Sequence, residues 1–421
     1  MKLLVKQATI FDTSSPYNGL IKDILIDNGI IERIDDTIDA DDVKTLKANS
    51  LMVSNGWVDI FSNFNDPGFE HKETLETGAN AAAAGGFTHV FVLPNTQPAV
   101  SNKTAVEYIV QKSKFLPITI LPIGAITKNI EGSELCEMYD MYNSGAIAFS
   151  DGLQPVQSPG LLLKAFQYRK AIDAVIIQLP VDKSISKFGL MNEGITSTRL
   201  GLPGIPSIAE ELMVSRDIEL AKYAGSKLHI TGISTAKSLQ VIKEAKENGV
   251  NITCSVAPYH LVFCDEDLFD YDTNLKTEPP LRSRQDMLAL RRGIEEGIVD
   301  CIASHHLPQN WDEKTCEFEY ASPGMIGLET VYIVINTIMP DITYERITDL
   351  LGNNARKIFS LSQPVIRENE VADLTLFTKE GSFVYDLSAV KSKSKNSPFI
   401  GKQLNGKVIG IINKDRLYLN E

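Results

Sequence analysis

The stretch NGWVDIFSNFNDPGFEHKETLETGANAAAAGGFTHVFVLPNTQP at residues 55–98 decides the fold. It holds two short apolar runs, WVDIFS at 57–62 and FTHVFVLP at 87–94, which predict buried strands. Between them lies TGANAAAAGG at 77–86, whose alanines favour a helix. Strand, helix and strand in this order make one β/α unit of a parallel sheet.

The same alternation continues along the chain. Further apolar runs are each followed by a segment of helical pattern; they lie at 118–124, 146–150, 174–179, 227–231, 251–256 and 300–304. A doubly wound open sheet would give the same alternation. Eight units within roughly 250 residues fit a (β/α)8 barrel of the TIM type better, and this α/β fold is the one that we predict.

Both ends of the chain predict strands instead. The opening MKLLVKQATIFD reads as a strand and not as a signal peptide, and Asn28-Gly29 is a hairpin turn signal. The last 50 residues return to short apolar runs with polar turns. We therefore predict a barrel at 53–365 and a small composite β-sandwich domain built from 1–52 and 366–421.

Composition narrows the possible partners. The formal net charge of -13 argues against a nucleic-acid backbone or an anionic membrane, because both attract clustered Lys and Arg. No apolar run approaches the length of a membrane-spanning helix. The five cysteines are odd in number and show no CxxC spacing, which indicates reduced thiols and a cytoplasmic location.

Barrel enzymes carry their reacting groups at the carboxyl ends of the strands. The residues at or near the predicted strand ends are of several kinds, and they include imidazoles and carboxylates. These residues are Asp59, Phe61, Asn63, Asn65, Asn95, Asp151, Gln178, His229, Gly232, Tyr259, His260, His305 and His306.

The surrounding motifs resemble those of dihydroorotases and related cyclic amidohydrolases. The resemblance begins with the Asp66-Pro67-Gly68 frame of the opening stretch and covers nearly the whole chain. Further matching segments are FSDG at 149–152, STA at 234–236, PPLR at 279–282, GLET at 327–330 and NSPFIGKQLNGKV at 396–408. The resemblance implies an amidohydrolase barrel that once held zinc.

The resemblance also shows where zinc ligands are expected. The family has His-x-His at the end of the first barrel strand, where this chain has Phe61 and Asn63. It has a His at the end of the fifth and of the sixth strand, where Gln178 and Gly232 stand. The Asp at the end of the eighth strand, the family's general acid/base, is His305 here. Phenyl rings and neutral amides are poor zinc ligands, so we expect no metal cofactor.

Two residues remain as vestigial candidates. Asp151 matches a carboxylate that bridges two zinc ions in one branch of the family, and His305 is the residual catalytic candidate. Without metals, the family's hydroxide attack on a cyclic amide has no evident source of activated water.

The matched substrate positions have changed as well. The Arg that would clamp a substrate carboxylate is Asn65, and the later His is Gln309. The Asn before PPLR is Glu278, which would repel an anion, and only Asn95 keeps its family identity. The segment 182–206 is predicted as a long loop that covers the pocket.

Three functions follow from these substitutions. The first is an inactive dihydroorotase homologue that scaffolds a pyrimidine-pathway enzyme such as aspartate carbamoyltransferase, with a homodimer as a further possibility. The second is an active dihydroorotase with one metal held by Asp151 and His305. The third is a metal-free binder whose pocket is lined by Phe61, Asn63 and Gln178.

Overall fold

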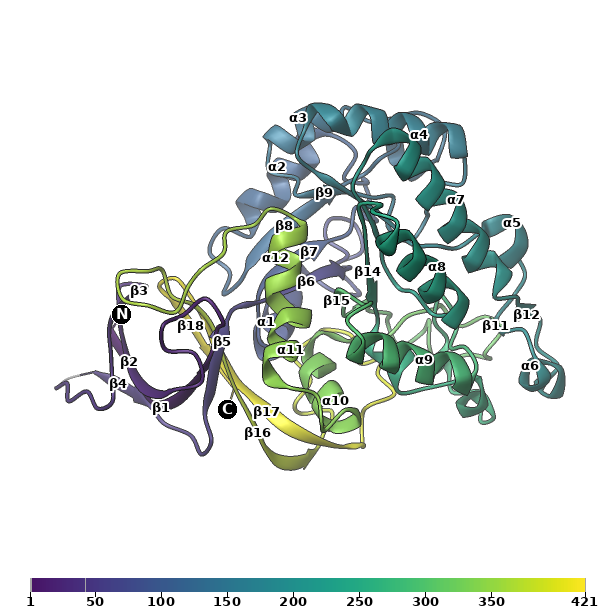
Figure 1. Cartoon of the computed structure of the whole chain (residues 1–421). Helices are drawn as coiled ribbons and strands as arrows, with labels where there is room; N and C mark the ends of the chain where they lie inside the picture. The colour runs from purple at the N-terminus through teal and green to yellow at the C-terminus, as the bar shows by residue number, and fades with distance from the viewer. Residues whose placement is uncertain (1, 42, 421) are drawn as a thin grey trace.

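The computed structural model describes residues 2–41 and 43–420. Its centre is a parallel sheet whose neighbouring strands follow chain order and curl into a barrel (Figure 1). The barrel closes where Ser62 forms a parallel bridge with His306 and the Asn63 N–H donates to the His306 carbonyl at 2.9 Å. The strands are β6 (Trp57–Ser62), β7 (Phe87–Val92), β8 (Thr119–Gly124), β9 (Ala148–Phe149), β10 (Val175–Gln178), β13 (Leu228–Ile230), β14 (Ile252–Val256) and β15 (Cys301–Ile302).

Helices surround this sheet. Each of the first helices starts at a side-chain cap: Thr74 accepts the Thr77 N–H before α1, and Asn102 accepts the Ala105 N–H before α2. In α1, four consecutive small alanines let the helix approach its neighbours closely. The outer helices are α1 (Leu75–Ala84), α2 (Lys103–Lys112), α3 (Met138–Asn143), α4 (Pro159–Tyr168), α7 (Ile208–Ala224), α8 (Ala236–Glu247), α9 (Arg284–Glu295), α10 (Val331–Ile338), α11 (Tyr344–Thr348) and α12 (Asn354–Ile358).

The two ends of the chain share a second, eight-stranded sheet. Its order is β18-β17-β16-β5-β1-β2-β3, and β4 pairs with β1. Figure 1 shows the purple N-terminal strands beside the yellow C-terminal ones. The strands are β1 (Lys2–Phe11), β2 (Ile21–Asp27), β3 (Ile30–Asp35), β4 (Lys44–Leu46), β5 (Met52–Asn55), β16 (Asp373–Val384), β17 (Gln403–Asn413) and β18 (Arg416–Leu419). The predicted fold class is confirmed, and the domain boundaries at 52/53 and 365/366 stay predictions.

Aromatic packing and one buried ion pair join the two sheets. Trp57 is fully buried, and its ring centroid lies 5.2 Å from those of Tyr332 and Phe377. Arg356 in α12 donates to Asp373 in β16 at 2.7 Å and to the Gly56 carbonyl at 2.8 Å. The barrel and the β-domain therefore share buried side chains at their junction.

The segment 182–206 is not the plain loop that the sequence predicts. It forms α5 (Lys183–Ser186), β11 (Met191–Asn192), α6 (Ile195–Leu200) and β12 (Gly204–Ile205). The two strands pair in parallel over only two residues each, which is too short for a periodic pattern to reveal. Within residues 2–41 and 43–420, no helix combines the length and apolar character needed to cross a membrane.

Candidate functional site at the barrel mouth

The end of β6 presents an aromatic ring and an amide to the barrel mouth. Phe61 is 1% exposed, and its ring centroid lies 4.6 Å from that of His305. The Asn63 side-chain oxygen accepts the Asn65 N–H at 2.9 Å. The Asn63 side chain thus fixes the local turn, and Phe61 fills space, at the two positions where zinc would need imidazoles.

Gln178 at the end of β10 is engaged with a buried carboxyl group. Its side-chain Nε2 donates to Asp217 in α7 at 3.2 Å. Burial raises the pKa of Asp217 to about 6, although the neighbouring Arg216 and Gln178 lower it. Gln178 is buried, and its Oε1 accepts no hydrogen bond within the described part of the chain. Gln178 therefore solvates Asp217 and offers only a neutral amide oxygen to the barrel.

The His305 ring fills the space that a side chain at position 232 would need. Gly232 has a φ of 69°, and a Cβ built there would lie 2.7 Å from Cε1 of His305. His305 itself has a φ of 47°, and its Nε2 lies 2.8 Å from the Thr231 hydroxyl. A histidine at position 232 is thus incompatible with the ring that now stands at position 305.

This close approach leads to a prediction for Gly232→Ala. We expect the left-handed backbone to cost about 1–2 kcal/mol and the contact with His305 about 1–3 kcal/mol more. Gly201→Ala is the matched control, because Gly201 has a φ of 68° with nothing within 4 Å of its Cβ position. Urea unfolding of both variants, alone and with His305→Ala, measures the difference. Equal losses for the two glycines would contradict the contact.

Asp151 supports the backbone instead of facing the mouth. Its Oδ1 accepts the N–H groups of Ile126 and Thr127 at 2.8 and 2.9 Å, and its Oδ2 accepts the Thr127 hydroxyl. Burial raises the pKa of Asp151 to about 6, while these hydrogen bonds lower it. Asn95 donates to the Asp151 carbonyl at 3.1 Å and accepts the Leu153 N–H at 3.0 Å. The side chains of Asp151 and Asn95 thus hold the backbone at the end of β9 in place.

A chain of hydroxyls and imidazoles fills the barrel interior behind His305. The Ser255 hydroxyl donates to that of Thr231 at 2.9 Å and lies 3.0 Å from Nε2 of His229. Nδ1 of His229 lies 2.8 Å from the Thr253 hydroxyl. His229 therefore packs inside the barrel, and hydroxyl groups lie within hydrogen-bond distance of both ring nitrogens.

The buried imidazoles make stability depend on pH. Burial lowers four pKa values from 6.5 to about 3 or 4, those of His89, His229, His260 and His305. The unfolded chain therefore binds more protons below pH 6.5, and the free energy of unfolding falls as the pH drops through this range. Buried carboxyl groups with raised pKa values, such as Asp151, Asp217 and Glu329, act in the opposite direction above their unfolded pKa, so the contribution of one imidazole is measured with a single variant.

We expect His229→Gln to reduce this slope by about 1.4 kcal/mol per pH unit between pH 4 and pH 6. Urea unfolding at several pH values measures the slope. The exposed His71, replaced by Gln, is the control for a His-to-Gln change at the surface. A variant slope equal to that of the parent would show that His229 does not stay neutral in the folded chain.

The residues matched to substrate positions are occupied by other partners. The Glu278 carboxylate accepts from Lys183 at 2.7 Å, and the Gln309 side-chain oxygen accepts from Lys72 at 2.9 Å. Asn65 is buried with a φ of 59°, and its Nδ2 meets no acceptor in the described ranges. Lys183 belongs to the 182–206 segment, so that segment does contact the mouth.

The cavity at the mouth is almost filled. The volume open to the centre of a water molecule is about 10 Å³, which is room for about one water. Ligand pockets for small molecules are typically several hundred Å³. The walls include Phe61, Tyr259, Glu278, His305 and Leu307.

These residues do not fit a zinc site. The positions where the family has zinc ligands hold a phenyl ring, two amides and a glycine. The Nε2 of His305 is within hydrogen-bond distance of the Thr231 hydroxyl. Among the described residues, no three His, Cys, Asp or Glu side chains gather in a way that could hold a metal ion. No catalytic step through a metal can be derived from this set of side chains.

Sequence reasoning missed the part played by residues 392–396. The Ser392 hydroxyl and the Lys393 N–H donate to Glu73, and Asn396 accepts the Gln309 N–H at 3.0 Å. This loop therefore braces the barrel mouth from the β-domain. The NSPF motif, which begins at Asn396, marks this loop in the sequence. The motif does not show which barrel residues the loop contacts.

The chain is similar to known proteins along its full length. A family model described as dihydro-orotase-like matches residues 50–238. The dihydroorotase of Syntrophus aciditrophicus (strain SB) is 37% identical over 100% of both chains. The dihydroorotase of Thermoanaerobacter sp. (strain X514) is 40% identical over 97% of this chain and 95% of its own.

Solved structures support the same fold. The L-hydantoinase (dihydropyrimidinase) from Arthrobacter aurescens has a TM-score of 0.85 at 21% identity and covers 99% of this chain and 96% of its own. The dihydropyrimidinase from Brevibacillus agri NCHU1002 has a TM-score of 0.82 at 20% identity, with 100% and 95% covered. At such identities the likeness concerns the fold alone. The two dihydroorotases are more similar in sequence, and they show that the chain belongs to the dihydroorotase family.

Proposed function

We propose that this family member does not hydrolyse dihydroorotate and serves as a non-catalytic homologue that scaffolds another enzyme of pyrimidine biosynthesis. The barrel mouth gives the main support for this proposal. Phe61 and His305 pack together there, at positions where the family has metal-site residues, and they leave room for about one water. The folded framework around the mouth is nevertheless complete. Retention of shape together with loss of the donors supports a role in assembly.

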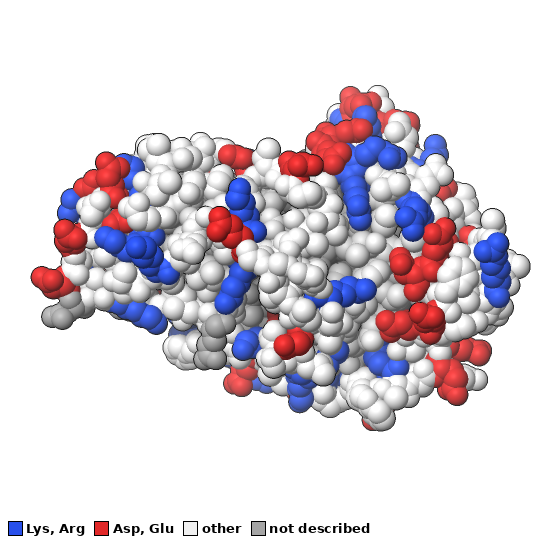
Figure 2. All heavy atoms as spheres, turned by 90° about the horizontal axis from the view of Figure 1, so that it is seen from below, with Lys and Arg blue, Asp and Glu red and all other residues white. Residues whose placement is uncertain are grey.

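Aspartate carbamoyltransferase is the proposed partner, because membership of the dihydroorotase family suggests a partner from the same pathway. The scaffold would act in the cytoplasm, alone or as a homodimer, and without nucleic acid or membrane. Acidic and basic side chains are interspersed on the face seen in Figure 2, which suits a protein partner better than a phosphate backbone.

Zinc content and turnover test the loss of catalysis. We expect well below one zinc ion per chain after incubation with zinc, and no hydrolysis of dihydroorotate in zinc-supplemented buffer. The dihydroorotase of Syntrophus aciditrophicus is the positive control. One or two ions per chain, with turnover that a chelator abolishes, would instead establish the active enzyme with a metal held by Asp151 and His305.

The scaffold role has a separate test. The purified chain is mixed with aspartate carbamoyltransferase from the same organism, and complex formation is followed by size-exclusion chromatography with light scattering. A shared peak of defined stoichiometry is expected. Separate elution at micromolar concentrations would overturn the scaffold role and leave the zinc result standing.

A further inference from the structure

A groove outside the barrel mouth lies between the β16–β17 hairpin and helices α1 and α10. By the same measure that gives about 10 Å³ at the mouth, this groove has about 410 Å³. Most of its wall surface is apolar, and Ala84, Ile333, Phe383 and Val408 contribute to it. None of the residues that line it also lines the mouth cavity. Its size and character match those of small-molecule sites.

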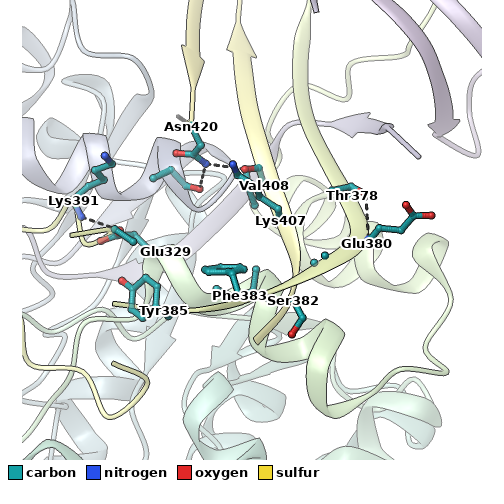
Figure 3. A pocket seen from close by; sticks show the side chains of 15 residues that line it. Glu329, Thr378, Glu380, Ser382, Phe383, Tyr385, Lys391, Lys407, Val408 and Asn420 are labelled. Carbon is teal, nitrogen blue, oxygen red and sulfur yellow. Dashed lines mark hydrogen bonds between the residues drawn. The ribbon is translucent and has the colours of Figure 1, made fainter. Parts of the chain in front are cut away.

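Two polar groups converge inside this groove. The Glu329 carboxylate accepts the N–H groups of Lys391 and Ser392 at 2.9 and 3.0 Å, and burial raises its pKa. Tyr385 is 3% exposed, and its hydroxyl points toward Glu329 (Figure 3). Burial and the neighbouring Glu329 raise the pKa of that hydroxyl, so it stays protonated beside the carboxylate.

Burial decides the sign of the charge that the groove prefers. Two acidic and two basic residues line it, but Glu380, Lys391 and Lys407 are exposed and screened by water. Glu329 is half-buried and held in place by the N–H groups of Lys391 and Ser392, so its carboxylate is the acidic group that the interior presents to a ligand. Phe383 and Tyr385 add aromatic rings beside it (Figure 3), and ring faces attract cations.

We propose that this groove binds a small organic cation, a primary amine carried on an apolar body about the size of one aromatic ring. The ammonium group donates to the Glu329 carboxylate, beside the Tyr385 hydroxyl. The apolar body packs against Ile333, Phe383 and Val408. The three kinds of contact already present in the groove are thereby used by one molecule.

Isothermal titration calorimetry on the full chain tests this with three probes of equal shape. They are phenethylamine, the neutral 2-phenylethanol and the anionic phenylacetate. We expect one phenethylamine site per chain and affinities at least about tenfold weaker for the other two, because they lack the charge-assisted hydrogen bond. Equal affinities for all three probes, or no heat from phenethylamine at millimolar concentration, would overturn the proposal.

Variants place the binding in the groove. Glu329→Gln should weaken phenethylamine binding about tenfold or more, and Tyr385→Phe by several-fold. Tyr385→Phe removes only the hydroxyl beside Glu329 and keeps the ring, so it keeps the test usable if Glu329→Gln does not fold. Glu247→Gln, on the exposed face of α8, removes an equal charge elsewhere and should change nothing. Unchanged affinity in both groove variants would contradict the assignment.

Discussion

Arg356→Ala is expected to lower the free energy of unfolding by about 3–5 kcal/mol. The side chain is fully buried and donates to Asp373 at 2.7 Å and to the Gly56 carbonyl at 2.8 Å. Truncation leaves the Asp373 carboxylate buried without the guanidinium that donates to it, and this loss outweighs the net value of the ion pair itself. Urea unfolding followed by circular dichroism measures the change.

An exposed ion pair supplies the control for Arg356. Arg284 lies 3.4 Å from Glu266, and their side chains are 66% and 56% exposed. Arg284→Ala should therefore cost less than about 1 kcal/mol. If Arg356→Ala cost no more than Arg284→Ala, Asp373 would have to be reached by water in the folded chain.

Trp57→Ala is expected to cost about 3–5 kcal/mol. The indole is fully buried among Phe87, Tyr332 and Phe377, and its N–H donates to the Ser54 hydroxyl at 3.1 Å. Removal leaves a cavity at the junction of the barrel and the β-domain, where residues from four elements meet and cannot all move inward. The midpoint of urea unfolding should fall accordingly.

The other tryptophan gives a matched comparison. Trp311 is 74% exposed, so Trp311→Ala should change the free energy of unfolding by no more than about 0.5 kcal/mol. Similar losses for both variants would mean that the junction repacks around the missing ring.

The sequence predicted the barrel well because burial on both faces of a parallel strand leaves a continuous apolar run. It overstated some strands. The run at 146–150 predicts five residues, but only Ala148–Phe149 pair as a ladder. Ile147 and Ser150 still donate to the carbonyls of Pro122 and Gly124. The twist of a closed barrel takes such end residues out of regular pairing while their hydrogen bonds remain.

The sequence shows which residue types lie at the candidate site, but it does not show how much free volume the cavity has. The sequence shows that Phe61, Asn63 and Gly232 lack the imidazoles that bind zinc at the matching positions of the family. How far the mouth is filled depends on the side-chain geometry of His305 and on its contact with Thr231. The brace from Ser392 to Glu73 joins residues 319 apart, and no local pattern contains such a contact.

The pairing of β5 with β16 has a consequence for synthesis on the ribosome. More than 300 residues separate Asn55 from Asp373, yet Leu374 pairs with Asn55 in the finished sheet. At about 5–20 residues per second, the edge of β5 waits roughly 15 to 60 s for its partner. An open, apolar strand edge can recruit other chains during that interval. Cellular yield should therefore depend on how fast the residues between β5 and β16 are translated and on chaperones that shield the nascent N-terminal strands.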